Sequence, residues 1–203
     1  MKEKKKMNLP NRLTVMRLCL VPFCVAAAAL PYDLIIPGLL PIIAAVIFTA
    51  ASLTDMLDGK IARKYNLVTD FGKFLDPLAD KFIVIGTMLA IVYRNEAIRP
   101  WFFWVVFTVI IREFAVTSLR LMISTGTGEV VAAAFAGKIK TVCQMLCVVA
   151  ALVEPVVLRA CGAGETLQAL PPVTLCLSVL TVIFTLWSGI AYFVSYKEVF
   201  RDR

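Results

Sequence analysis

Residues 55–80 read DMLDGKIARKYNLVTDFGKFLDPLAD and connect two apolar segments, 34–57 and 71–93, whose ends they overlap. Each segment has the roughly 20 residues that a helix needs to cross a bilayer. The basic cluster between them, residues 60–64, favours the cytosolic side of a membrane. We therefore expect two transmembrane helices joined by a short cytosolic loop that carries these cations.

The chain as a whole is too apolar for a soluble globular domain. Of its 203 residues, 60% are hydrophobic and 17% are charged, and the mean hydropathy is +0.85. We predict an all-α integral membrane protein, a six-transmembrane-helix bundle in a single domain, 1–203, with a basic juxtamembrane segment, 1–12. A signal peptide is the alternative interpretation of the N-terminus, but a polar insert separates its lysines from the apolar run. The predicted spans are 13–32, 34–57, 71–93, 100–123, 131–153 and 173–196.

The basic residues orient this bundle. Six spans put both termini on one side of the membrane. Of the 21 lysines and arginines, only Arg94, Arg99 and Arg159 lie beside loops on the far side, which leaves 18 on the side of the termini. We therefore expect cytosolic termini in a bacterial-type cytoplasmic (inner) membrane. The net charge of +7 then fits anionic lipid headgroups and no nucleic acid.

Cysteine and histidine usage excludes several kinds of site. The chain has no histidine, which removes mechanisms with a histidine nucleophile or base. It has no C-x-x-C pair, so a zinc site is not expected. The six cysteines fall almost entirely in apolar runs, and we expect them to be buried packing residues. They are Cys19, Cys24, Cys143, Cys147, Cys161 and Cys176.

Three predicted spans reach membrane length only by including charges in their cytosolic halves. Because a charge in hydrocarbon is costly, we expect these side chains to line a polar cavity open to the cytosol. The alternative is that side chains at helix ends snorkel to the surface, which serves for Arg17, Arg120 and Lys138. The interrupting residues are Asp76 and Asp80 in the third span, Arg112, Glu113 and Arg120 in the fourth, and Lys138 and Lys140 in the fifth.

Four aspartates gather at the turn between the second and third spans. Asp55 and Asp58 are three residues apart and Asp76 and Asp80 four apart, so each pair lies on one helical face. Two carboxylates 4 Å apart repel by about 4 kcal/mol at an effective dielectric constant near 20. Divalent cations are the natural counterions, and ligands that are all oxygen favour Mg²⁺ or Mn²⁺.

Small and basic residues lie between the acids. Gly59, Ala62 and Gly72 allow close approach of a backbone, either to a nucleotide or diphosphate or to a neighbouring helix. Arg63 suits a phosphate, although a single arginine there also agrees with cytosolic positive charge alone.

These residues together match a fixed motif. The pattern D-x2-D-G-x2-A-R-x8-G-x3-D-x3-D resembles the signature of the CDP-alcohol phosphatidyltransferase family, whose six spans and cytosolic termini also agree with the predicted topology. Eight identities at fixed offsets make the motif specific. It is matched by Asp55, Asp58, Gly59, Ala62, Arg63, Gly72, Asp76 and Asp80.

The resemblance implies a role for each residue. It implies a two-metal site with Mg²⁺ or Mn²⁺, in which Asp80 is also the general base for the acceptor hydroxyl. It implies CDP-diacylglycerol as the donor, and it favours a homodimer. The metal ligands would be Asp55, Asp58, Asp76 and Asp80, and the CDP-diacylglycerol site would comprise Pro10, Asn11, Thr14, Gly59, Ala62, Arg63, Thr69 and Gly72.

The fourth and fifth spans bear on the acceptor. Residues 110–120 (IIREFAVTSLR) and 134–144 (AFAGKIKTVCQ) resemble the branch of the family that uses sn-glycerol 3-phosphate. The phosphate of sn-glycerol 3-phosphate would be a second anion beside the donor diphosphate, and it would need cations of its own. An arginine at 112 could instead pair with an acid, and the lysines could bind lipid headgroups. Inositol phosphate, phosphatidylglycerol or serine are alternative acceptors. The expected glycerol 3-phosphate site is Arg112, Arg120, Lys138 and Lys140.

Two other classes of protein gather acids in membranes. A metal ion transporter would be expected to show repeated halves and charges along a path across the membrane, and neither is found. A membrane prenyltransferase would carry two separated aspartate-rich motifs, whereas this chain has one. The reaction that the family resemblance implies is therefore retained: transfer of a phosphatidyl group to glycerol 3-phosphate, which gives phosphatidylglycerol phosphate and CMP.

Overall fold

The structure is a computed structural model that describes residues 9–64, 70–123 and 131–195, with side chains described for 12–54, 78–119 and 137–194. Every helix or strand in this part of the chain is an α-helix. The contacts divide the chain into two compact units, Met1–Arg94 and Asn95–Arg203. We refer to them as unit 1 and unit 2.

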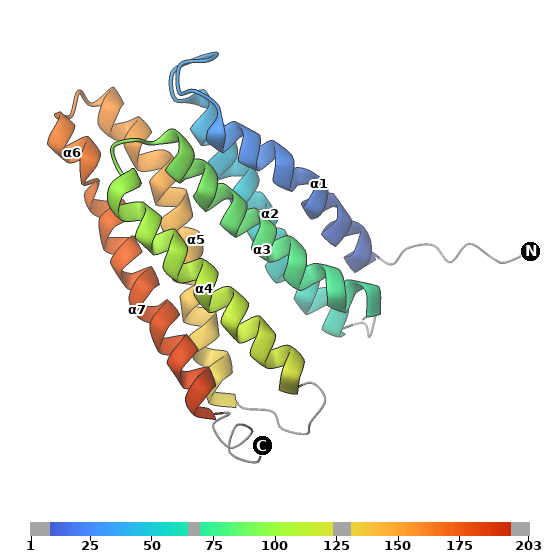
Figure 1. Cartoon of the computed structure of the whole chain (residues 1–203). Coiled ribbons are helices and arrows are strands. Elements are labelled where there is room, and N and C mark those ends of the chain that lie inside the picture. Colours follow the sequence, from blue (N-terminus) through green and yellow to red (C-terminus); the bar gives the residue numbers. More distant parts are fainter. Residues whose placement is uncertain (1–8, 65–69, 124–130, 196–203) are drawn as a thin grey trace, which may run out of the picture. The chain divides into compact units, whose positions relative to one another are not determined.

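Unit 1 consists of three long helices, α1 (Leu9–Ala29), α2 (Leu39–Lys64) and α3 (Asp70–Arg94), and α1 packs against both others (Figure 1). Their contacts depend on small side chains. The Cys24 thiol lies 3.4 Å from Thr87 Oγ1 and 3.5 Å from the Ala44 carbonyl oxygen. A Cβ atom at Gly86 would lie 2.9 Å from Val25 Cγ2, so glycine is needed for this close approach.

The connection between α1 and α2 corrects the predicted second span. We expected a helix from residue 34, but α2 begins at Leu39. Gly38 has a φ of 79°, a left-handed conformation that glycine adopts without strain, and Pro37 precedes it. Leu34 and Ile35 are exposed in this turn. Hydrophobicity therefore extended the prediction past a proline–glycine stop signal.

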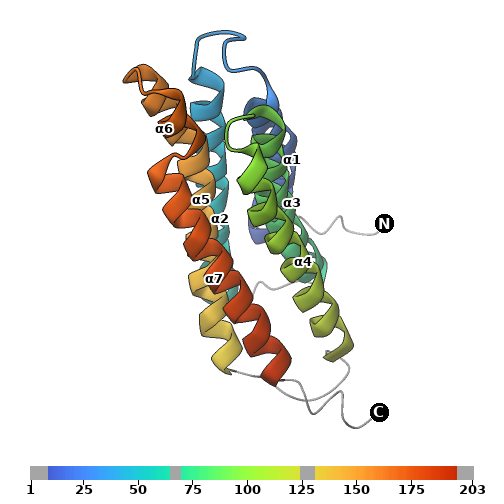
Figure 2. The ribbon, with the colours of Figure 1, turned by 60° about the vertical axis from the view of Figure 1, so that its left-hand side comes forward.

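Unit 2 consists of α4 (Arg99–Ile123), α5 (Val131–Ala160), the short α6 (Glu165–Ala169) and α7 (Pro172–Ser195). The contacts of α7 with α5 and α4 hold the unit together, and α5 and α7 lie side by side in Figure 2. The predicted fifth span ended at residue 153, whereas α5 continues past Pro155 to Ala160. The predicted loop 154–172 also contains α6.

A carboxylate from α5 caps the start of α7. Glu154 Oε1 accepts the Val173 backbone N–H at 2.9 Å, and Oε2 accepts the Thr174 backbone N–H at 2.6 Å and its hydroxyl at 2.6 Å. These N–H groups belong to the first turn of a helix, where they have no partner within the helix, and negative charge there is favourable. Glu154 therefore fixes the entry of α7 against α5.

Four described helices are long and apolar enough to cross a membrane, and the chain is an integral membrane protein. Residues 39–54 of α2 form a shorter apolar helix. Only described residues bear on this finding, so the predicted number of six spans stays a prediction. The windows are Arg12–Ala29, Arg99–Leu119, Gly137–Ala160 and Glu165–Val194.

The cysteines only partly follow the prediction of buried packing residues. Cys24 and Cys147 are buried and Cys143 is half-buried. The prediction is wrong for the other three, because an apolar run in a membrane protein also supplies the outer face of the helix. The exposed cysteines are Cys19, Cys161 and Cys176.

Candidate active site

The acidic motif occupies the end of α2 and the first half of α3. Asp55 and Asp58 lie in α2, which continues to Lys64, so Arg63 is helical and the basic cluster is not in a loop as expected. Gly59 and Ala62 are in the same helix. The motif residues from Asp55 to Arg63 recur every three to four positions, which is the spacing of one helix face, and this spacing continues through the basic cluster.

The second acidic pair lies on α3, four residues apart, with Gly72 in the first turn of the helix. Asp80 is half-buried. The predicted residue Thr69 lies outside the described residues. The side chains of the remaining motif residues also lie outside the described part. They are Asp55, Asp58, Gly59, Ala62, Arg63, Gly72 and Asp76.

The donor set of the motif fits a hard divalent cation. Among the residues whose side chains are described, no three acidic, histidine or cysteine side chains form a group that could hold a metal ion. Of the four aspartates, only Asp80 belongs to that part of the chain. The helical backbone nevertheless keeps each pair on one face of its helix, and carboxylate oxygens are the ligands that Mg²⁺ and Mn²⁺ prefer.

The predicted nucleotide-binding residues near the N-terminus belong to α1. The described helix begins at Leu9, so Pro10 and Asn11 are helical, and its apolar window begins at Arg12. Proline fits the first turn of a helix because it needs no hydrogen-bond donor there. Thr14 is buried at 3% exposure. The side chains of Pro10 and Asn11 lie outside the described ranges.

Arg17 does not snorkel to the membrane surface, which was the alternative considered for it. Its exposure is 2%, and it is among the largest fully buried side chains of the described residues. It follows Thr14 by three residues, so the two lie on one face of α1. The structure thus adds a buried cation to unit 1 that the motif did not predict.

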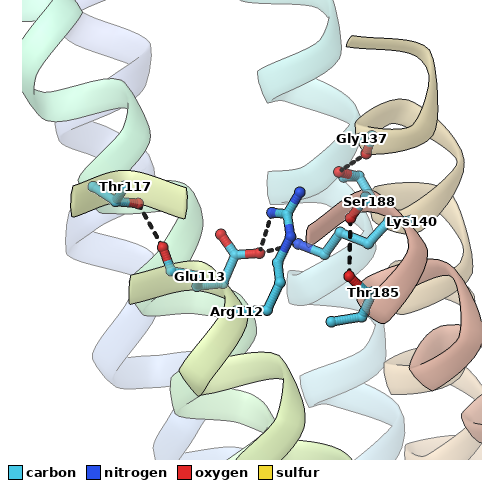
Figure 3. A network of polar contacts seen from close by, with 8 residues as sticks. Arg112, Glu113, Thr117, Gly137, Lys140, Thr185 and Ser188 are labelled. Atoms are coloured by element: carbon cyan, nitrogen blue, oxygen red, sulfur yellow. Dashed lines mark hydrogen bonds and ion pairs between the residues drawn. The ribbon is translucent and has the colours of Figure 1, made fainter. Parts of the chain in front are cut away.

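Three charged side chains form a buried cluster in unit 2. Glu113 Oε1 accepts from Arg112 Nη1 at 3.1 Å and from Lys140 Nζ (Figure 3). The side chains of Arg112, Glu113 and Lys140 are only 11%, 13% and 7% exposed. Burial strengthens these interactions and makes an uncompensated charge costly, so the carboxylate fixes both cations in place.

Arg112 has donor capacity left after this ion pair. Its Nε is buried and has no hydrogen-bond partner among the described residues. A Cβ atom at Gly189 of α7 would lie 3.5 Å from Arg112 Cγ, so the glycine lets the arginine lie close to that helix. Figure 3 shows Arg112 between α4 and the part of α7 that carries Thr185 and Ser188. A buried guanidinium with an unused donor is suited to bind an anion.

The four predicted acceptor-site residues differ in their surroundings. Lys140 is buried in the cluster with Arg112, whereas Lys138 is exposed. The Arg120 side chain lies outside the described part of the chain. The pairing of Arg112 with Glu113 was the considered alternative, and Lys140 shares the same carboxylate oxygen.

Sequence reasoning did not predict that Glu113 joins Arg112 to Lys140, or that Gly189 lies against Arg112. The role of Glu113 was considered only as a partner for Arg112, because Lys140 is 27 residues away on another helix. Gly189 gave no signal beyond being a glycine within an apolar helix. The charge of Glu113 within a predicted span was the one feature that pointed to it.

Comparison with known proteins supports the family that the motif predicts, and the match extends over nearly the whole chain. Residues 7–187 match the family model described as CDP-alcohol phosphatidyltransferase. A CDP-diacylglycerol–glycerol-3-phosphate 3-phosphatidyltransferase of Bacillus subtilis is 42% identical over 201 residues, covering 96% of this chain and 97% of the relative. Proteins of the same name from Salmonella typhimurium and Yersinia pestis are 34% identical over 200 residues and 38% identical over 154 residues. The match to the Salmonella typhimurium protein covers 97% of this chain and 98% of the relative. The match to the Yersinia pestis protein covers 74% of this chain and 79% of the relative. This chain therefore belongs to the CDP-alcohol phosphatidyltransferase family.

Proposed function

We propose that the chain transfers the phosphatidyl group of CDP-diacylglycerol to sn-glycerol 3-phosphate, which gives phosphatidylglycerol phosphate and CMP. The observation that carries this proposal is that relatives named for this reaction are 34–42% identical over 96–97% of the chain.

In this reaction a hydroxyl oxygen of the acceptor attacks the phosphorus that carries diacylglycerol. The new P–O bond forms in line with the bond to CMP, which breaks as CMP leaves. Asp80 accepts the proton of the hydroxyl, because an alcohol is a poor nucleophile at neutral pH. Asp55, Asp58, Asp76 and Asp80 would hold Mg²⁺ or Mn²⁺, which when bound stabilises negative charge on the transferring phosphate.

The donor nucleotide is assigned to the motif and the N-terminal part of α1. Arg63 would pair with a phosphate, and Gly59 and Gly72 would allow the nucleotide to approach the helix backbone. The remaining residues proposed for this role are Pro10, Asn11, Thr14, Ala62 and Thr69.

The acceptor phosphate is assigned to the cations of unit 2. Arg112 and Lys140 are held by Glu113, which leaves the buried Arg112 Nε as a donor for a phosphate oxygen. Arg120 and Lys138 are proposed to add positive charge. An acceptor without a phosphate, such as serine, would leave the buried cations without an anion, which is unfavourable.

We also propose six spans with cytosolic termini, in a bacterial-type cytoplasmic membrane, with a polar cavity that opens to the cytosol. The excess of basic residues on the side of the termini supports this orientation. A homodimer is proposed from the family resemblance alone.

A panel of acceptors tests the proposed function. Purified protein in detergent with CDP-diacylglycerol and Mg²⁺ or Mn²⁺ is given glycerol 3-phosphate, inositol phosphate, phosphatidylglycerol or serine, and released CMP is measured. Of the four acceptors, we expect only glycerol 3-phosphate to give CMP release. Release with another acceptor, and none with glycerol 3-phosphate, would overturn the choice of acceptor.

A further inference from the structure

Arg17 is buried within α1, inside the span Arg12–Ala29. A buried guanidinium is unfavourable unless polar or anionic groups compensate its charge. Helix α1 contains no acidic residue, so the compensation has to come from another part of the chain. Arg17 is not part of the predicted motif, so its role has to be inferred from the residues that lie next to it.

The contact between α1 and α3 gives the register of these helices. The two helices run in the same direction within unit 1 (Figure 1), and the Cys24 thiol lies 3.4 Å from Thr87 Oγ1. Arg17 lies seven residues before Cys24, and Asp80 lies seven residues before Thr87. Seven residues are two helical turns, and the face drifts by only about 20° over that length. Arg17 and Asp80 therefore lie at the same level on facing sides of the two helices.

We propose that Arg17 is a positioning residue for the aspartate cluster. It is the resident cation that balances part of the negative charge and holds Asp80 oriented toward the acceptor hydroxyl. This inference rests on the proposed function, in which Asp80 is the general base. A guanidinium suits the task because it stays charged at any physiological pH and its planar fork matches the geometry of a carboxylate.

Burial is compatible with this role, and the kinetic measurements below distinguish it from direct binding of the donor diphosphate. Arg17 lies among the core side chains of unit 1, with buried Thr14 before it and Cys24 after it on the same face. Charge compensation needs only that Arg17 stays fixed beside the acids.

Two measurements on Arg17→Met test the proposal. Without the guanidinium the carboxylates attract a divalent ion more strongly, so Mn²⁺ should raise the melting temperature of the metal-free variant more than that of the wild type. Half of this rise should be reached at a lower Mn²⁺ concentration. The kcat for CMP release should fall by about 10- to 100-fold, a loss typical of residues that orient metal ligands. The KM for CDP-diacylglycerol should change by less than about twofold.

Arg17→Lys and Arg99→Met are the matched variants. Lysine keeps the charge but not the fork, so Arg17→Lys should show the wild-type response to Mn²⁺ with a kcat about tenfold lower. Arg99 is exposed and pairs with Glu96, so Arg99→Met should change neither quantity. If Arg17→Met does not fold, Arg17→Lys decides, and a wild-type kcat would overturn the proposal.

The remaining outcomes are also decisive. An unchanged or weaker Mn²⁺ response in Arg17→Met would overturn charge compensation. A raised KM for CDP-diacylglycerol with unchanged kcat would instead make Arg17 a substrate-binding residue. Failure of the proposed function is separately visible, since the wild type would then release no CMP with glycerol 3-phosphate.

Discussion

At the scale of single residues, Glu113 determines what the cations of unit 2 can do. One of its oxygens accepts from both Arg112 and Lys140, so one negative charge is shared by two positive ones. The three side chains keep a net positive charge in a buried place, where the attraction for an anion is stronger than at a surface. The carboxylate holds the cations in place and leaves charge for a phosphate.

Replacement of Glu113 by glutamine should weaken binding of the acceptor. The neutral side chain raises the net positive charge of the cluster but no longer fixes Arg112 and Lys140. Because the bound phosphate needs both donors in place, the KM for glycerol 3-phosphate should still rise by about tenfold, while the KM for CDP-diacylglycerol stays the same. Steady-state CMP release checks this. Glu96→Gln, at the exposed pair with Arg99, is the control and should have wild-type kinetics. An equal rise in both KM values would contradict a specific role at the acceptor.

The aspartates should differ in what their loss removes. Asp80→Asn removes the general base and should lower kcat by at least about 100-fold, with CDP-diacylglycerol binding largely intact. Asp55→Asn removes a metal ligand and should weaken both binding and turnover. Binding of the donor can be followed with a spin-labelled or fluorescent CDP-diacylglycerol. Mild and equal effects of the two substitutions would contradict these roles.

The residues that sequence could predict are those with fixed local spacing. The eight motif positions lie within 26 residues of one another, so their pattern is visible without a structure. Arg17 and Glu113 depend on partners brought together by helix packing. The sequence of α1 alone could not show whether Arg17 snorkels to the surface or is buried, because the same local sequence is compatible with both.

At the scale of elements, the start of α7 depends on a carboxylate of α5. Glu154 satisfies the first-turn N–H groups of Val173 and Thr174, at a point where the chain turns back from α6. Sequence predicted the long helices from apolar runs but misplaced their ends. Pro155 lies inside α5 and was expected to lie beyond it, and Gly38 ends a turn that was expected to be helix. Hydrophobicity fixes which segments are buried or face lipid, whereas end positions depend on single residues.

Loss of the cap should destabilise unit 2 without changing the chemistry. Glu154→Ala leaves the first-turn N–H groups of α7 unsatisfied, which should cost about 1–2 kcal/mol and lower the melting temperature. Thermal unfolding in detergent measures this, and CMP release well below the transition should be that of the wild type. Glu96→Ala, at the exposed pair with Arg99, is the control, because a surface ion pair contributes little to stability. Equal stability of the two variants would show that the contacts of Glu154 contribute nothing.

At the scale of the whole molecule, the helices have the lengths and apolar surfaces of membrane spans. Composition alone predicted the all-helical membrane class, and the described residues agree with it. The single-domain organisation and the number of six spans stay predictions. Orientation rests on the distribution of lysine and arginine, which is a property of the sequence.

The orientation can be tested with a native cysteine. Cys161 is exposed and lies just beyond the end of α5, on the side predicted to be external. A membrane-impermeant maleimide added to intact spheroplasts should label it, because a thiol in water reacts and one in lipid does not. Cys161→Ser should lose this label, which excludes the other cysteines. Labelling only after lysis would contradict cytosolic termini.

The most direct test of the proposed chemistry follows the oxygen of the acceptor. Purified protein is given CDP-diacylglycerol and glycerol 3-phosphate labelled with ¹⁸O in its free hydroxyls, and the products are analysed by mass spectrometry. Attack on the phosphorus that carries diacylglycerol predicts phosphatidylglycerol phosphate that keeps the label, together with unlabelled CMP in equal amount. Release of phosphatidic acid, with the label joined to the cytidine product, would contradict transfer of the phosphatidyl group.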